Sequence, residues 1–246
     1  MGKNINARNS GQADKATIWF IVGFIVLVTA GAIIAGAYSS GQPSASGAAT
    51  STFVATVVPA ITAADWSEGN PNAKVSLIEY GDFECPACGE YAPIVQQLVQ
   101  NYSSTVLFVF RNFPLYTIHP FAGISAQAAE AAGLEGGAAK YWAMHDLLYS
   151  KQSEWSTNSG LTPAQVVTQY FDGYAQSIGL NVNTFDNDMN ATSVAQKIQT
   201  DVTGGTAAQI DHTPTFFMNL VQIPNPTSLA DFEKTLDAAV ASSTGQ

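Results

Sequence analysis

Cys85 and Cys88 are the only two cysteines in the 246-residue chain, and they lie three residues apart. A disulfide across so short a loop adds little stability, so the bond is better suited to being made and broken. The alternatives are a structural disulfide, two unreactive thiols or a zinc site. Zinc needs about four ligands, and the chain adds only three scattered histidines: His119, His145 and His212. We therefore interpret the pair as a redox centre that uses neither metal nor cofactor.

The elements around the pair predict how its two thiols differ. An apolar strand is predicted over residues 74–80, and a helix is predicted to run from Cys85 to about residue 102. The first turn of a helix stabilises a thiolate, so the pKa of Cys85 should lie below about 8.5. Pro86 suits the first helical position because its missing N–H needs no partner there. We expect Cys85 to be exposed and nucleophilic, and Cys88 to be buried and to act as the resolving thiol.

The remaining patterns predict an α/β domain with a long helical region. A second apolar strand at residues 105–110 completes a strand–helix–strand unit, which requires a parallel, right-handed crossover. A third strand is expected at residues 215–220, a short edge strand at 221–223 and a last helix at 229–241. Between them, helices are predicted over residues 118–134, 138–150, 162–178, 184–189 and 193–202, the last ended by Gly204-Gly205.

The N-terminal part predicts a membrane anchor. Residues 18–37 are almost wholly apolar, and about twenty such residues span a bilayer as a helix. Lys3, Arg8 and Lys15 precede the run, which places the N-terminus in the cytoplasm by the positive-inside rule. We predict a cytoplasmic tail over residues 1–15, one transmembrane helix over 16–38, a flexible linker over 39–56 and the folded domain over 57–246. The alternative is a signal peptide cleaved after residues 35–37.

The net charge and the cellular compartment limit which molecules can be partners of this protein. The net charge of −10 argues against nucleic acid, which requires a basic surface. An anchor and a signal peptide both place the cysteines outside the cytoplasm, where disulfides persist. The expected location is therefore the cell membrane with an extracytoplasmic domain, or secretion if the segment is cleaved.

The motif and its surroundings resemble the DsbA-like branch of the thioredoxin-fold thiol–disulfide oxidoreductases. Glu79 lies six residues before Cys85, where family members place a buried acid, and Pro93 matches a proline in their first long helix. Residues 213–217 resemble the loop whose cis-proline, here Pro214, faces the cysteines. The helical region at about 117–203 resembles the insertion typical of this branch. The resemblance covers residues 74–241 and implies a thioredoxin fold with a helical insertion.

The resemblance also implies roles for individual residues. A cis bond at Thr213–Pro214 would turn the Thr213 backbone towards Cys85, where it pairs with an extended substrate segment. Glu79 would accept the Cys88 proton during resolution, or else serve as a structural acid.

The residues around the thiolate depart from the strongly oxidising members. Ala87 stands where those members carry histidine, so the Cys85 thiol is expected to be less acidic than theirs. Glu84 would raise the Cys85 pKa if it pointed inward. His212 either supplies the missing cation or faces solvent.

The predicted function is a monomeric, extracytoplasmic oxidoreductase that introduces disulfides into cysteine-containing secreted or surface proteins through Cys85 and Cys88. A membrane partner would reoxidise or reduce the pair. One alternative is a reductase or isomerase of the same fold. Another is a non-catalytic module that binds copper(I) through its thiolates.

Overall fold

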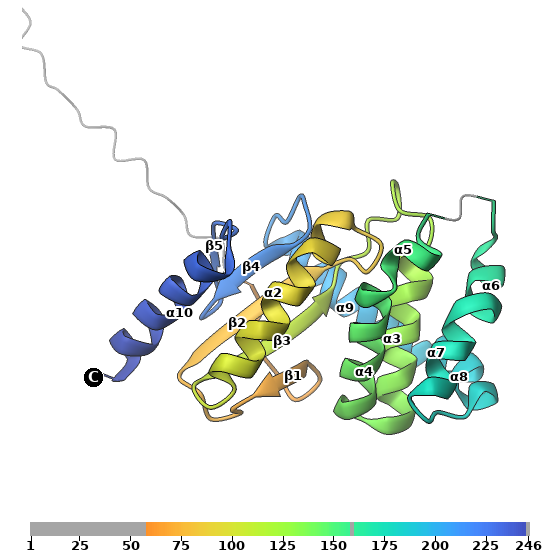
Figure 1. The fold of residues 1–246 in the computed structure, drawn as a ribbon, viewed down its shortest axis with the longest axis horizontal. Helices are drawn as coiled ribbons and strands as arrows, with labels where there is room; N and C mark the ends of the chain where they lie inside the picture. Colours follow the sequence, from red (N-terminus) through yellow and green to blue (C-terminus); the bar gives the residue numbers. More distant parts are fainter. Residues whose placement is uncertain (1–57, 158–159, 245–246) are drawn as a thin grey trace, which may run out of the picture. The chain divides into compact units, whose positions relative to one another are not determined.

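Five strands form one mixed sheet in the order β1-β3-β2-β4-β5 in the computed structural model of the chain (Figure 1). Their bounds are Trp66–Gly69 (β1), Val75–Gly81 (β2), Val106–Asn112 (β3), Thr215–Met218 (β4) and Val221–Ile223 (β5). β2 and β3 run parallel, and the other neighbours are antiparallel. The predicted strand–helix–strand unit is confirmed, because α2, Pro86–Tyr102, joins β2 to β3.

The described residues are 58–157 and 160–244. The chain divides into two units, Met1–Thr52 and Phe53–Gln246. The predicted tail, transmembrane helix and linker at residues 1–56 lie outside the described residues. Within the described ranges, every helix is too short or too polar to cross a bilayer.

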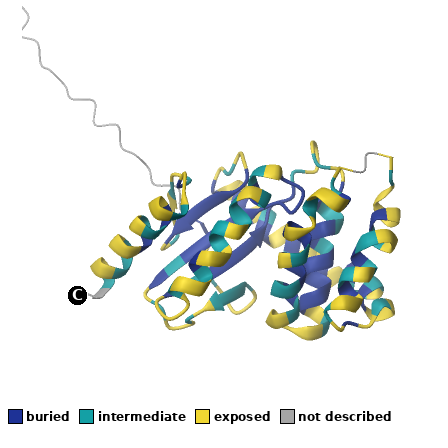
Figure 2. Cartoon of the chain, in the orientation of Figure 1, coloured by how far each residue is buried: buried dark blue, intermediate teal, exposed yellow. Residues whose placement is uncertain are grey.

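Alternation along the strands builds a core on each face of the sheet, because successive side chains point to opposite sides. One face packs against α2 and against α10, Leu229–Thr244, through a cluster that includes Val75, Leu77, Phe108, Phe216 and Phe232. The other face carries a second cluster, which includes Val58, Ile78, Tyr80, Val109 and Phe217. Figure 2 shows the central strands as mostly buried between these layers. Residues at the carboxyl end of β2 are therefore held rigidly from both sides.

A block of helices lies between β3 and β4 in the chain, as predicted for residues 117–203 (Figure 1). Its members are α3 (Ala122–Gly136), α4 (Ala138–Ser150), α5 (Gln152–Trp155), α6 (Pro163–Val166), the π-helix η2 (Val167–Phe171), α7 (Asp172–Ser177), α8 (Val182–Met189) and α9 (Thr192–Ala207). The capping box at Thr162 and Gln165 begins α6. Large buried side chains such as Trp155 and Phe171 join this block to the active-site end of the sheet. The block therefore forms one wall of the region that holds the cysteines.

The predicted end of α9 at Gly204-Gly205 is wrong, because the helix continues to Ala207. A Cβ on Gly204 would lie 3.1 Å from the Pro59 ring, and one on Gly205 would lie 2.7 Å from the Phe113 ring. These glycines therefore serve the close approach of the helix to its neighbours rather than a helix stop. Two short elements, β1 and α5, were not predicted.

Candidate active site at the start of α2

Cys85 is the N-cap residue of α2, and Pro86 occupies the first turn, as the sequence predicted. Both cysteines are free thiols. Cys88 is fully buried, and only 7% of Cys85 is exposed. The prediction of an exposed Cys85 is therefore wrong in degree. Cys85 belongs to the core cluster shared with the helical block, which covers most of its surface.

The two thiols have pKa values shifted in opposite directions. The Cys88 thiol, by hydrogen bonding to the Cys85 sulfur, is the largest cause that lowers the pKa of Cys85 to about 5. Burial opposes the shift, while Thr213 and the backbone at Cys88 and Ala87 add to it. Burial, followed by Cys85 and Glu79, raises the Cys88 pKa well above its ordinary value. At neutral pH the pair therefore consists of a Cys85 thiolate and a Cys88 thiol, the arrangement that nucleophilic attack by Cys85 requires.

The loop before β4 faces Cys85. The Thr213–Pro214 peptide bond is cis, as the resemblance implied. The carbonyl oxygen of Thr213 lies 3.4 Å from Cys85 Sγ. Asn225 Nδ2 donates to the Pro214 carbonyl at 2.7 Å, which fixes the loop from the following segment. A backbone edge therefore stands directly beside the nucleophilic sulfur.

Glu79 lies in the central strand β2, where it is paired in register with Phe110 of β3 and Phe216 of β4. Only 6% of the residue is exposed. Burial is the main cause that raises its pKa to about 8, and the charge on Cys85 adds to the shift. The charge on Glu79 also helps to raise the pKa of Cys88. Its role as proton acceptor for Cys88 stays a prediction.

Glu84 was expected to raise the Cys85 pKa if it pointed inward, but its side chain is bonded to another element. Its Oε2 accepts a hydrogen bond from the Phe121 backbone N–H at 2.5 Å, immediately before α3 begins. Burial raises the pKa of Glu84, while the Phe121 hydrogen bond lowers it. Glu84 therefore anchors the start of α3 to the active-site turn.

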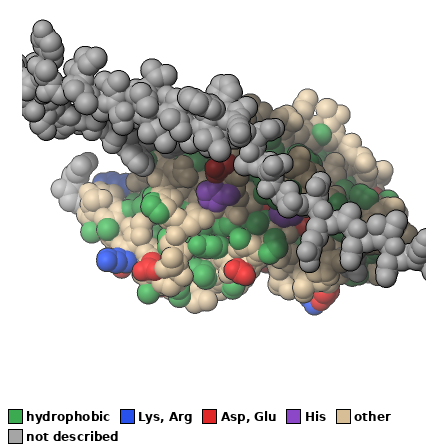
Figure 3. Space-filling model, turned by 90° about the horizontal axis from the view of Figure 1, so that it is seen from above, with side chains coloured by type: hydrophobic (Ala, Val, Ile, Leu, Met, Phe, Trp, Pro, Cys, Tyr) green, Lys and Arg blue, Asp and Glu red, His purple; other side chains and the backbone are tan. Residues whose placement is uncertain are grey.

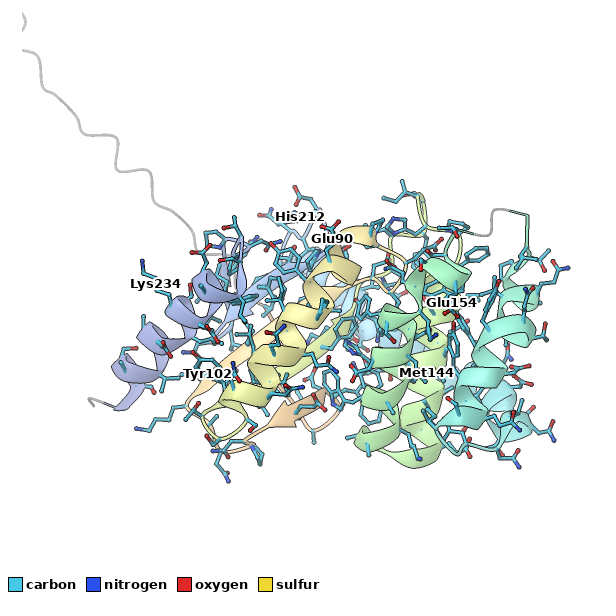
Figure 4. The ribbon with its side chains drawn as sticks, viewed as in Figure 1. Glu90, Tyr102, Met144, Glu154, His212 and Lys234 are labelled. Carbon is cyan, nitrogen blue, oxygen red and sulfur yellow. The ribbon has the colours of Figure 1, made fainter. Side chains whose placement is uncertain are left out.

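His212 takes the solvent-facing alternative. Its Nδ1 lies 2.7 Å from Asp211 Oδ1, and 55% of its side chain is exposed. Figure 4 labels His212 at the edge of the molecule, at the end where α2 begins. Ala87 is partly buried and packs against the core of the helical block. The structure therefore assigns the lowering of the Cys85 pKa to Cys88 and the helix start rather than to a histidine.

The sequence reasoning missed Asp82, whose side chain is fully buried in the active-site turn. Its Oδ1 accepts from the Glu84 N–H at 2.8 Å, and its Oδ2 accepts from the Leu115 N–H at 2.9 Å. His119 Nδ1 lies 2.7 Å from the same Oδ2. Asp82 thus joins the cysteine turn to the loop after β3. Its position directly after a strand, in a turn, was the available signal, because acids there often bond backbone N–H groups.

Gln152 of α5 was also missed. Its Nε2 donates to the carbonyl oxygens of Phe83 and Cys85, at 2.7 and 2.9 Å. The helical block therefore supports the cysteine turn directly. The sequence carries no signal for this contact, because the partners lie 69 and 67 residues apart.

Figure 3 looks onto the upper side of the molecule, and the described surface there carries hydrophobic and neutral side chains with few charged ones.

In the described ranges, no group of three or more His, Cys, Asp or Glu side chains could hold a metal ion.

A family model described as thioredoxin matches residues 62–238. The chain therefore belongs to the thioredoxin family. Among curated proteins it is 37% identical over 163 residues to a Na(+)/H(+) antiporter NhaA 1 of Salinispora arenicola, covering 66% of this chain and 23% of that protein. It is also 34% identical over 186 residues to NhaA 3 of Salinispora tropica, covering 76% and 26%. The chain thus spans about a quarter of the length of these relatives.

Several solved structures share the fold. BdbD from Bacillus subtilis has a TM-score of 0.64 at 20% identity, with 76% of this chain and 98% of that chain covered. Alpha-DsbA1 from Wolbachia pipientis has a TM-score of 0.64 at 18% identity, with 76% and 95% covered. DsbA2 from Pseudomonas aeruginosa has a TM-score of 0.57 at 23% identity, with 74% and 95% covered. The thioredoxin fold with a helical insertion, expected from the sequence, is thereby confirmed.

Proposed function

We propose that the chain is a thiol–disulfide oxidoreductase that introduces disulfides into cysteine-containing proteins outside the cytoplasm. The observation that carries the proposal is the placement of the two thiols: Cys85 is the N-cap of α2 beside the cis Thr213–Pro214 loop, and Cys88 is fully buried. This placement lowers the pKa of Cys85 to about 5 and raises that of Cys88 well above its ordinary value. A stable Cys85 thiolate favours the reduced pair, which makes the oxidised pair a better acceptor of electrons.

The proposed reaction has two exchanges. A substrate thiolate attacks Cys85 Sγ of the oxidised pair, the Cys85–Cys88 bond breaks, and Cys88 leaves as a thiolate that takes up a proton. A second substrate thiolate then attacks the substrate sulfur of the mixed disulfide, and Cys85 leaves as a thiolate. The substrate loses two electrons and the pair gains them, so a further partner must reoxidise the pair.

The Thr213 backbone is the proposed binding edge for the substrate. Its carbonyl lies 3.4 Å from Cys85 Sγ, and its side-chain Oγ1 has no hydrogen-bond partner within the described part of the chain. An extended segment that pairs with this backbone would bring its own cysteine to Cys85.

The proposed location is the outer side of a cell membrane, with the chain anchored through residues 16–38. Support comes from the apolar run at residues 18–37 and the three basic residues before it. The proposed reoxidising partner is a membrane protein. Intact-mass analysis of the purified protein tests the anchor, since a mature start just after Ala37 would instead indicate cleavage.

A reductase or isomerase is the second candidate. Ala87 favours it, because no imidazole between the cysteines stabilises the thiolate further. The equilibrium redox potential of the pair separates the two. A potential near those of strong oxidants supports the oxidase, and one near the thioredoxin value of about −270 mV supports the reductase.

Trapping in cells tests the oxidoreductase itself. Cys88→Ala retains the nucleophile but cannot resolve, so it should accumulate mixed disulfides with secreted partners. Cys85→Ala is the matched control and should accumulate none. Equal trapping by the two variants would refute the assigned roles.

A further inference from the structure

A small cavity lies between the sheet, α2 and α4, and Glu79 is one of the residues that line it. Its volume is about 20 Å³. A cavity needs about 10–15 Å³ to hold one water, together with two to four polar partners. Its lining is mostly apolar, but three residues carry polar groups: Glu79, Trp142 and His145. The cavity thus has the size and the polar groups for a single water.

One polar atom of each of these residues lacks a hydrogen-bond partner within the described part of the chain. Glu79 Oε1, Trp142 Nε1 and His145 Nε2 are buried, and no hydrogen bond reaches them from the described residues. Leaving such an atom unbonded is unfavourable, because it has lost its hydrogen bonds to water. The indole N–H is a donor, whereas the carboxyl oxygen accepts or, when protonated, donates. One water between the three groups would satisfy all of them.

His145 lies between the cavity and a carboxylate at the protein surface. Its Nδ1 lies 3.0 Å from Asp146 Oδ1, and the Asp146 side chain is 50% exposed. With Nδ1–H donating to that carboxylate, Nε2 of the neutral ring is the acceptor. Asp146 and Gln96 line an open groove of about 370 Å³ between α2 and α4. The two ring nitrogens therefore face two environments, because Nε2 is buried and Nδ1 lies beside a half-exposed carboxylate.

The ring is held in that orientation. Its centroid lies 4.8–6.4 Å from those of five aromatic side chains: Phe83, Phe110, Tyr141, Trp142 and Tyr149. Aromatic packing of this kind is a common structural role for a buried histidine, but it does not explain why Nε2 is buried without a hydrogen-bond partner among the described residues.

We propose that His145 carries protons between Glu79 and solvent, through one water in the cavity and the Asp146 carboxylate. This inference rests on the proposed oxidoreductase function. In the step where Cys88 resolves a mixed disulfide, the Cys88 proton passes to the Glu79 carboxylate and the thiolate attacks Cys85 Sγ. The Cys85–Cys88 bond forms and the bound thiol leaves with its electron pair. The proton then leaves Glu79 for the water and enters His145 at Nε2, while the Nδ1 proton leaves towards Asp146.

The charged surroundings set when this route matters. Glu79 interacts electrostatically with Cys85 and Cys88 at the start of α2 and with Tyr141 and Tyr149 of α4. Asp146 interacts in the same way with Glu68 of β1. The Glu79 pKa is about 8 in the reduced protein, and burial, its main cause, also raises it in the mixed disulfide, where the Cys85 charge is absent. Below its pKa the carboxyl already holds a proton and must lose it before it accepts another. Above that pH it accepts directly. The route is therefore needed at low pH and dispensable at high pH.

A single-turnover experiment with oxidised glutathione and the reduced full-length protein tests the inference. Acid quenching and mass analysis separate glutathionylation of Cys85 from its resolution by Cys88. His145→Gln keeps a donor and an acceptor but cannot pass a proton through its side chain. It should slow resolution about 10- to 100-fold at pH 6.5, with little effect at pH 9 and none on glutathionylation.

Two further variants sharpen the result. Asp146→Asn should slow resolution with the same pH dependence, and Asp188→Asn, on α8 and away from cavity and groove, is its matched control. Equal slowing of His145→Gln at both pH values, or no slowing, would overturn the proton route. If the unchanged protein is glutathionylated but never closes a Cys85–Cys88 disulfide, the oxidoreductase function itself fails and the route with it.

Discussion

Glu79 and Glu130 are two carboxyl groups with nearly equal burial and very different surroundings. Exposure is 6% for Glu79 and 3% for Glu130. Burial is the main cause that raises both pKa values, to about 8 for Glu79 and about 7 for Glu130. Their hydrogen bonds and neighbouring charges differ. Glu79 Oε1 has no partner among the described residues, whereas the charge of Lys197 lowers the pKa of Glu130.

Glu130 belongs to a network that joins the helical block to the sheet. Its two oxygens accept from Trp66 Nε1 and Asn112 Nδ2, both at 2.7 Å. The neighbouring Asp201 accepts from the Asn112 N–H at 3.1 Å and from Lys197 Nζ at 2.7 Å. All four carboxylate oxygens of Glu130 and Asp201 are therefore bonded.

A raised pKa alone therefore does not identify a functional acid. A carboxylate bonded at both oxygens holds elements together, and changing its proton count breaks those bonds. Glu79, with a free oxygen beside two thiols and a cavity, changes protonation without breaking a structural contact. Labelling of the thiols and substitution of each acid separate these roles.

The two thiols beside Glu79 should differ most sharply. At pH 7 Cys85 is almost wholly thiolate and Cys88 almost wholly thiol. Brief treatment of the reduced protein with iodoacetamide should therefore modify Cys85 at least about 100-fold faster than Cys88. Peptide mass mapping measures the ratio. Preferential labelling of Cys88 would contradict the assignment.

Glu130→Leu should destabilise the fold by roughly 3–4 kcal/mol at pH 6. The substitution leaves Trp66 Nε1 without its acceptor and removes the shorter of the two hydrogen bonds of Asn112 Nδ2, whose other acceptor is Asp201 Oδ2 at 3.4 Å. Urea unfolding of the reduced protein measures the change. Resolution of a glutathione mixed disulfide should stay at the wild-type rate, and a rate loss as large as that of Glu79→Leu would remove the distinction between the two acids.

Glu79→Leu should have the opposite sign. Because the folded pKa of about 8 lies above the ordinary 4.5, the folded protein holds a proton that the unfolded chain releases. Ionisation of Glu79 therefore costs stability as pH rises from about 4.5 to about 8, and the variant escapes that cost. Reduced Glu79→Leu should be more stable than wild type by roughly 2–3 kcal/mol at pH 8, with a smaller gain at pH 5. A loss of stability at pH 8 would show that Glu79 is a structural acid like Glu130.

Ala87→His should have the smallest effect. An imidazolium at this position would further lower the Cys85 pKa, but the Cys88 thiol and the helix start already lower it to about 5. The potential should rise by roughly 30 mV, the equivalent of about one pKa unit. A glutathione redox titration beside an ultraviolet titration of the thiolate measures both quantities. A fall in potential would show that residue 87 does not face the thiolate.

Much of the site was predictable, because its signals are local. The strand before Cys85, the helix that begins there and Pro86 in its first turn follow from patterns within a few residues of each other. The helical block was predictable from caps such as Thr162 and from apolar spacing. The cis bond at Thr213–Pro214 came from family resemblance, since composition alone does not predict it.

Only the tertiary structure decided how these parts meet. Asp82 bonds the loop after β3, Gln152 reaches the cysteine turn from α5, and Glu84 caps α3 instead of facing the thiolate. The packing also leaves only 7% of Cys85 exposed and forms a cavity lined in part by Glu79. These features depend on contacts between residues 30 to 130 positions apart. A local pattern determines which element a residue enters, but the packing of distant elements determines what its side chain touches.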